Sequence, residues 1–114
     1  MNILTKSREL TPKEVYLLTM SPETQKMSDA EGSIIEIDAS ITYSDINSKG
    51  EEQTLLTIKT PEGETFSTNS PTFIEDFRKM NELFQGMGEK VNAIKVSSGM
   101  SKNDRKFITC VYEN

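Results

Sequence analysis

The chain has 114 residues and a formal net charge of −5, with 18 Asp and Glu against 13 Lys and Arg. This length predicts a single domain, 1–114, that is large enough to bury a core. The acidic total argues against duplex DNA binding over the whole surface. No segment is long and apolar enough for a membrane span or a signal peptide, so we expect a cytoplasmic protein, in the host cell if the chain is viral.

The N-terminal part, residues 1–12, is expected to be loose. The following apolar run Val15–Leu18 is compatible with two structures. Thr11 to Glu14 has the spacing of a helix capping box with Pro12 at the first helical position. The β-branched and aromatic content of the run favours a strand, and we predict a strand. Ser21–Gly32 is expected to be a loop or short helix anchored by Met27.

Three strands are predicted next. Apolar and polar residues alternate through Ser33–Ser44, which is typical of one long half-buried strand. Gln53–Thr60 is a second strand after the turn-rich segment Asp45–Gly50, and a tight turn at Pro61–Gly63 leads into a third strand, Thr65–Thr68.

A helix is predicted after these strands, capped by Ser70 or by Thr72 and ending at Gly86. Its Phe and Met residues lie on one face at helical spacing, which indicates core packing. Two further strands follow, Val91–Ser98 and Lys106–Tyr112, joined by the loop Gly99–Arg105.

This order predicts a mainly β fold: a five-stranded barrel like the oligonucleotide/oligosaccharide-binding (OB) fold, with one helix between strands three and four. The N-terminal segment would add a strand or a short helix. Small α+β sandwiches share the same order, so the order alone does not distinguish the two architectures.

Charge is unevenly distributed along the chain. Lys90 to Lys106 contains five basic residues and one acid, whereas Glu9 to Glu89 contains six basic residues and sixteen acids. A cationic hairpin on an acidic domain offers a polyanion a local docking site. The same charges also suit a hairpin whose lysines only keep the protein soluble.

The residues for most catalytic sites are missing. Histidine is absent and Cys110 is the only cysteine, which removes most zinc sites and Ser-His-Asp or Cys-His arrangements. Cys110 lies on a predicted strand and suits a small buried hydrophobe. Acidic pairs such as Glu36 and Asp38 leave open a carboxylate hydrolase or a Mg²⁺ site. We expect no enzyme, no metal and no cofactor.

Single strands are bound by base stacking on aromatic rings together with a positive groove for the backbone. Tyr43 and Phe66 are the predicted stacking residues, while Phe107 suits the core equally well. The cations expected around them lie in the loops and strands that border the binding face of such a barrel: Lys49, Lys59, Lys95, Lys102, Arg105 and Lys106.

Several short fragments also resemble one family. These fragments look like the small single-stranded-DNA-binding proteins of bacteriophages and mobile elements, including phages that prime replication with a terminal protein: Gly32–Glu36, Gly63–Phe66, Thr68–Phe73, Ile94–Gly99, Ser101-Lys102 and Arg105–Cys110. The resemblance implies a compact barrel that coats replication intermediates without chemistry. It also implies a glycine where Asn103-Asp104 stands.

The resulting hypothesis is sequence-tolerant single-stranded DNA binding that protects DNA during phage or mobile-element replication, with replication proteins as further partners. The alternative is a phage-encoded interaction module that inhibits a host DNA-binding enzyme through its acidic surface. The oligomeric state is open.

Overall fold

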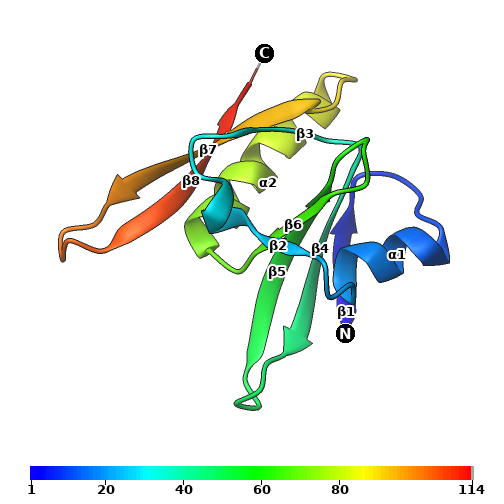
Figure 1. The fold of residues 1–114 in the computed structure, drawn as a ribbon. Helices are drawn as coiled ribbons and strands as arrows, with labels where there is room; N and C mark the ends of the chain where they lie inside the picture. Colours follow the sequence, from blue (N-terminus) through cyan, green and yellow to red (C-terminus); the bar gives the residue numbers. More distant parts are fainter. Residues whose placement is uncertain (114) are drawn as a thin grey trace.

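The fold is mainly β, with its strands arranged in two sheets (Figure 1). The computed structural model describes residues 1–113, and in that range it contains eight strands, two α-helices and one short 3₁₀ helix, η1. The elements are β1 Asn2–Lys6, α1 Pro12–Thr19, β2 Gln25–Lys26, η1 Met27–Ala30, β3 Ile34–Glu36, β4 Ala39–Ile46, β5 Glu52–Lys59, β6 Thr65–Thr68, α2 Pro71–Gly86, β7 Ala93–Met100 and β8 Lys106–Tyr112.

The larger sheet has the order β1-β4-β5-β6-β2, and the smaller sheet has the order β3-β7-β8. Neighbouring strands are antiparallel except for β2 and β6, which run parallel. The predicted strands from Gln53 onward and the predicted helix are confirmed, with shifts of at most two residues at their ends. The exact ends of such elements depend on local hydrogen bonding.

The prediction of one long strand over Ser33–Ser44 was wrong, because the segment breaks between β3 and β4. The amide of Ile37 donates to the carbonyl of Asn92, just before β7, at 2.8 Å. The next amide, of Asp38, donates to the carbonyl of Lys59 on β5, also at 2.8 Å. Successive backbone amides therefore bond to different sheets, and the segment passes from the smaller sheet to the larger one.

The main core lies between the sheets and one face of α2. Phe73 and Phe77 of α2 are buried there against Leu56 and Ile58 of β5. Met27 of η1 is fully buried in the same cluster, which confirms its predicted role as an anchor. The helix begins where Ser70 Oγ accepts a hydrogen bond from the amide of Phe73 at 3.3 Å, so Ser70 is the cap rather than Thr72.

The N-terminal segment adds both a strand, β1, and a short helix, α1, as the fold prediction allowed, but two other N-terminal predictions were wrong. Residues 2–6 are not loose, because β1 pairs with β4, with an irregularity between Ile3 and Thr5. Val15–Leu18 lies in α1 and not in a strand. The capping box decides this: Thr11 Oγ1 accepts from the amide of Glu14 at 3.2 Å, and Glu14 Oε1 accepts from the amide of Thr11 at 3.0 Å. Leu18 then becomes buried against β4.

The two sheets do not close into a barrel. Within residues 1–113, β6 pairs with β5 and β2, and β8 pairs with β7 alone. A pocket of about 400 Å³ occupies the opening between the end of β6 and the start of β8, beside η1. In the part of the chain that the structure describes, neither α1 nor α2 has the length and apolarity that crossing a bilayer requires.

Candidate nucleic-acid interface

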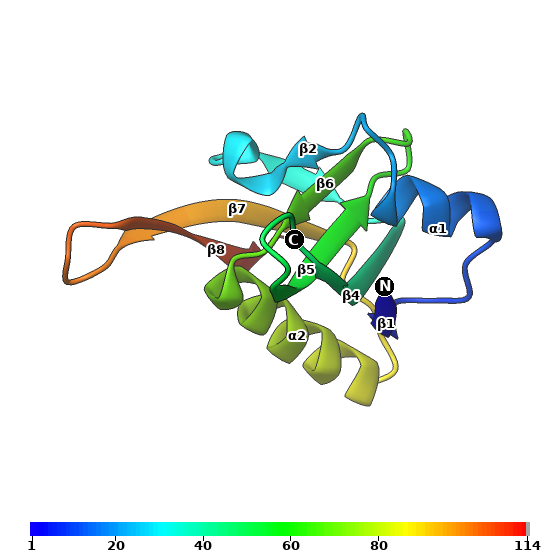
Figure 2. The same ribbon diagram turned by 90° about the horizontal axis from the view of Figure 1, so that it is seen from below.

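The β7–β8 hairpin forms an arm that extends beyond the helices and the larger sheet (Figure 2). Its turn is closed by two backbone hydrogen bonds, from the amide of Ser101 to the carbonyl of Arg105 at 2.8 Å and from the amide of Asp104 to the carbonyl of Ser101 at 3.0 Å. Asp104 has a φ of 58°, the left-handed conformation that glycine adopts most readily. This backbone explains why a glycine would suit this turn, as the family resemblance implies.

Three of the predicted cations are exposed on this arm. Lys95 lies on β7, and Lys102 and Arg105 lie in the turn. None of the three takes part in an ion pair with another residue in the range 1–113. Their charge therefore faces solvent, where an anionic ligand can approach it.

Lys106 differs from these three because it pairs with Glu31, the residue that follows η1. This hydrogen bond lowers the pKa of the Glu31 carboxyl below its ordinary value. The ion pair ties the turn end of the arm, at the start of β8, to the residue after η1 and neutralises the Lys106 charge locally, so Lys106 contributes less to a phosphate site than predicted.

Lys59 is not available for a phosphate either. Its Nζ lies 2.5 Å from Asp38 Oδ2, and its side chain is only 14% exposed. Arg8 joins the same carboxylate at 3.2 Å and also pairs with Glu14 of α1 at 2.6 Å. Lys59 and Arg8 thus hold the break between β3 and β4 and the start of α1 together.

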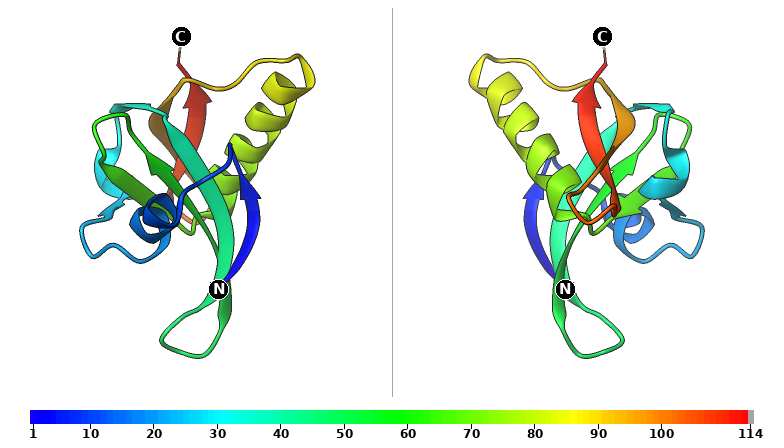
Figure 3. Two further views of the ribbon diagram at one scale, coloured as in Figure 1. Left: turned by 90° about the vertical axis from the view of Figure 1, so that its right-hand side faces the viewer. Right: turned by 90° about the vertical axis from the view of Figure 1, so that its left-hand side faces the viewer.

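Lys49 is exposed, but on another arm. It lies in the β4–β5 turn, which projects from the molecule in a different direction from the β7–β8 arm (Figures 1 and 3). Glu51 and Glu52 are exposed beside it. The two arms therefore carry opposite local charge, and Lys49 does not extend the cationic surface of β7–β8.

Tyr43, predicted to stack on bases, is a core residue. It is 5% exposed and packs with Ile41 and Leu18, with Leu55 alongside, under α1. Burial raises the pKa of its hydroxyl above the ordinary value. The helix α1 thus covers the part of the β4–β5 face that a stacking Tyr43 would need.

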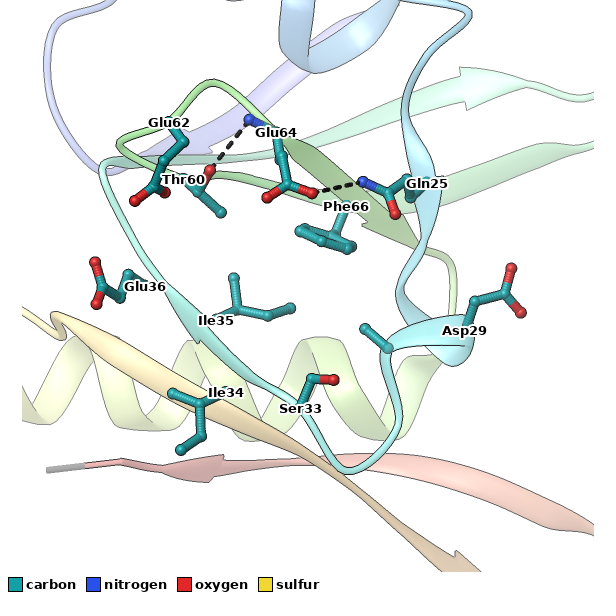
Figure 4. Close-up of a pocket in the computed structure, with 11 residues that line it drawn as sticks. Gln25, Asp29, Ser33, Ile34, Ile35, Glu36, Thr60, Glu62, Glu64 and Phe66 are labelled. Carbon is teal, nitrogen blue, oxygen red and sulfur yellow. Dashed lines mark hydrogen bonds between the residues drawn. The ribbon is translucent and has the colours of Figure 1, made fainter.

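Phe66, the other predicted stacking residue, is half-buried on the inner face of β6. It packs against the main core and lines a pocket of about 480 Å³. Figure 4 shows its ring directed toward Ile35 across this pocket. Four acidic residues line the pocket: Asp29, Glu36, Glu62 and Glu64. Glu64 accepts a hydrogen bond from Gln25 at 3.1 Å. Carboxylates at this density repel a phosphate backbone, which argues against a DNA-stacking role for Phe66.

The aromatic residue placed beside free cations is Phe107, which the sequence left undecided. It lies on β8 directly opposite Gly99 of β7 and is half-buried. A Cβ atom added to Gly99 would meet the Phe107 ring at 2.7 Å. The ring therefore extends across the neighbouring strand on the face away from the core. The sequence could have indicated this position, because Phe107 alternates along β8 with the buried residues Ile108 and Cys110.

Cys110 is buried in the main core. Burial raises the pKa of the Cys110 thiol to about 12, so the thiol stays protonated and inert. No group of three His, Cys, Asp or Glu side chains within that range is arranged to hold a metal ion. Comparisons of the chain with protein-family models, with curated proteins and with solved structures found no match.

Proposed function

We propose that this protein binds single-stranded DNA without chemistry and with little sequence preference, as a protein that coats DNA during phage or mobile-element replication in the cytoplasm. The observation that carries the proposal is the β7–β8 arm, which presents Lys95, Lys102 and Arg105 without ion pairs in the described chain. An anionic strand would gain from these charges while avoiding the acidic body.

We further propose that the architecture is an open variant of the OB fold. The segment from β3 to β4 contributes to both sheets, pairing with β7 at one end and with β5 at the other. The helix α2 lies between β6 and β7 in sequence, as expected for this fold. OB folds are partly open five-stranded barrels that bind oligonucleotides, so this connectivity supports the proposed function.

Titration of a fluorescent oligo-dT at 50 mM and 200 mM salt tests the proposal. We expect binding at the lower salt concentration that weakens at the higher one, because bound cations release counterions from the strand. Duplex DNA of the same length should bind more weakly. Absence of oligo-dT binding at 50 mM salt would overturn the proposed function.

The arm itself is tested by replacing Lys95, Lys102 and Arg105 together with Gln. The slope of log affinity against log salt should become shallower by about 0.7 for each phosphate that is no longer neutralised, or about 2 in all. The matched control replaces Lys13, Lys79 and Lys90, which lie outside the arm, and should change the slope by much less. Equal effects of the two triple variants would show that only total charge matters.

A second candidate function is favoured by the acid-lined pocket beside Phe66. This pocket suits a basic segment of another protein, as an inhibitor of a host DNA-binding enzyme would require. Affinity capture from nuclease-treated host lysate separates the candidates. A stoichiometric protein partner, together with absence of oligo-dT binding, would favour the inhibitor.

A further inference from the structure

The smaller sheet has one buried face and one uncovered face. Ile94, Val96, Ile108 and Cys110 point inward to the core. The opposite face, called here the outer face, consists of four cross-strand rows. These rows are Glu36–Ala93, Ile34–Lys95–Val111, Ser97–Thr109 and Gly99–Phe107.

The outer face exposes apolar groups without an element of the described chain packed over them. Ile34 is 55% exposed and Val111 is 46% exposed. Figure 4 shows Ile34 and Ile35 on opposite sides of β3, and both residues line the acidic pocket. The acidic pocket therefore adjoins the β3 edge of the outer face.

The Phe107 ring occupies space on this face that a side chain at position 99 would fill. The absence of a Cβ at Gly99 leaves the space that the ring tip occupies, 2.7 Å from where that atom would be. A ring held across a neighbouring strand loses little side-chain entropy when a second flat group stacks on it. Nucleic-acid bases supply such a group, and each base stacked on an aromatic ring contributes roughly 1–3 kcal/mol.

Three cations on and around the outer face favour an anionic ligand, while Glu36 lies in the row farthest from the turn. Lys95 stands in the row between Ile34 and Val111, and Lys102 and Arg105 lie at the tip beyond Phe107. The Lys95 and Phe107 rows are four residues apart along the strand, or about 14 Å at 3.4 Å per residue. A single strand of DNA that lies along the face would thus contact Lys95, then the Phe107 ring and then the cationic turn.

We propose that the outer face of the β3–β7–β8 sheet is the platform on which the bases of single-stranded DNA rest, with Phe107 as the stacking ring. This inference rests on the proposed function and assigns its site. A duplex keeps its bases stacked inside the helix, so the platform discriminates in favour of single strands. It lies apart from the β4–β5 face that α1 covers.

The test is an oligo-dT titration at 50 mM salt with three variants, each checked by thermal melting. Phe107→Leu should weaken binding at least about tenfold, because the side chain remains apolar but can no longer stack. Phe107→Tyr keeps the ring and should bind within about twofold of the unmodified protein. Gly99→Ala moves the ring without removing it and should weaken binding severalfold, while the melting temperature stays within a few degrees.

The outcomes separate this inference from the proposed function. If the unmodified protein does not bind oligo-dT, both are overturned. If it binds, and Phe107→Leu and Gly99→Ala bind equally well, the platform alone is overturned. Sedimentation velocity tests a second copy as the occupant: a dimer that Val111→Lys dissociates, with DNA affinity unchanged, would also overturn the platform.

Discussion

Two sheet faces of this protein begin from the same kind of sequence and end in different environments. One face of β4 and β5 presents Tyr43 and Leu55, and α1 packs over this face with Leu18. The outer face of β7 and β8 presents Phe107 and Val111 and stays open within the described chain. Alternating strands thus give either a second core or an open surface, and the element packed on top decides which.

The comparison shows that aromatic exposure is a tertiary property in this fold. Tyr43 and Phe107 both lie in alternating strand sequences. The capping box at Thr11 to Glu14 starts a helix that covers the first residue. Phe107 lies opposite Gly99, and its ring is partly exposed to solvent. A mutation should therefore affect stability on the first face and affinity on the second.

The largest expected effect is on stability, at Tyr43. Tyr43→Ala should lower the free energy of unfolding by about 3 kcal/mol, since removing a large buried side chain leaves a cavity under α1. Urea denaturation measures this loss. The matched control, Phe107→Ala, should lose less stability because its ring is already half-exposed. A larger stability loss at Phe107 than at Tyr43 would reverse the comparison of the two faces.

The next effect concerns the turn of the arm. Asp104→Gly relieves the left-handed backbone and removes a negative charge beside Arg105, so we expect a stability gain of about 0.5 kcal/mol and a severalfold gain in oligo-dT affinity. Asp104→Asn removes only the charge and should raise affinity with little change in stability. Unchanged affinity in both variants would show that DNA does not sense the turn.

The smallest expected effect is a pH dependence at α1. The hydrogen bond from Arg8 lowers the pKa of Glu14 from an ordinary 4.5 to about 2. A carboxyl with a lowered pKa in the folded state adds stability above its unfolded pKa, and that contribution disappears as the pH falls through the folded value. The melting temperature should thus fall between pH 4.5 and pH 2, and Glu14→Gln should reduce this fall. An identical pH profile in the variant would exclude this contribution.

Local sequence signals predicted the later part of the fold well. The strand Thr65–Thr68, the helix from Pro71 to Gly86 and the strand Lys106–Tyr112 each have clear alternation, helical spacing or turn residues. The error at Val15–Leu18 arose where two local signals competed, and the capping box outweighed the β propensity. Strand β1 had no clear local signal, because it forms by pairing with β4, which is remote in sequence. The break at Ile37 and Asp38 had no local signal, because it depends on hydrogen bonds to the carbonyls of Asn92 and Lys59, which are remote in sequence.

The candidate site was predictable in its charge but not in its rings. The cluster Lys95, Lys102 and Arg105 was visible in the sequence, and the structure places all three residues on one exposed arm. The pairing of Lys59 with Asp38 and of Lys106 with Glu31 was not visible, because the partners lie in other elements. Side-chain burial likewise depends on contacts that a single sequence does not display.

The most direct test of the binding platform is NMR titration of the protein with oligo-dT, followed through side-chain signals of both faces. We expect the Phe107 ring and the Ile34 and Val111 methyl groups to shift in proportion to bound DNA. The Tyr43 ring and Leu55 methyl groups under α1 should stay in place. Shifts concentrated at Tyr43 and Leu55, with Phe107 unchanged, would contradict the account and place the DNA on the other face.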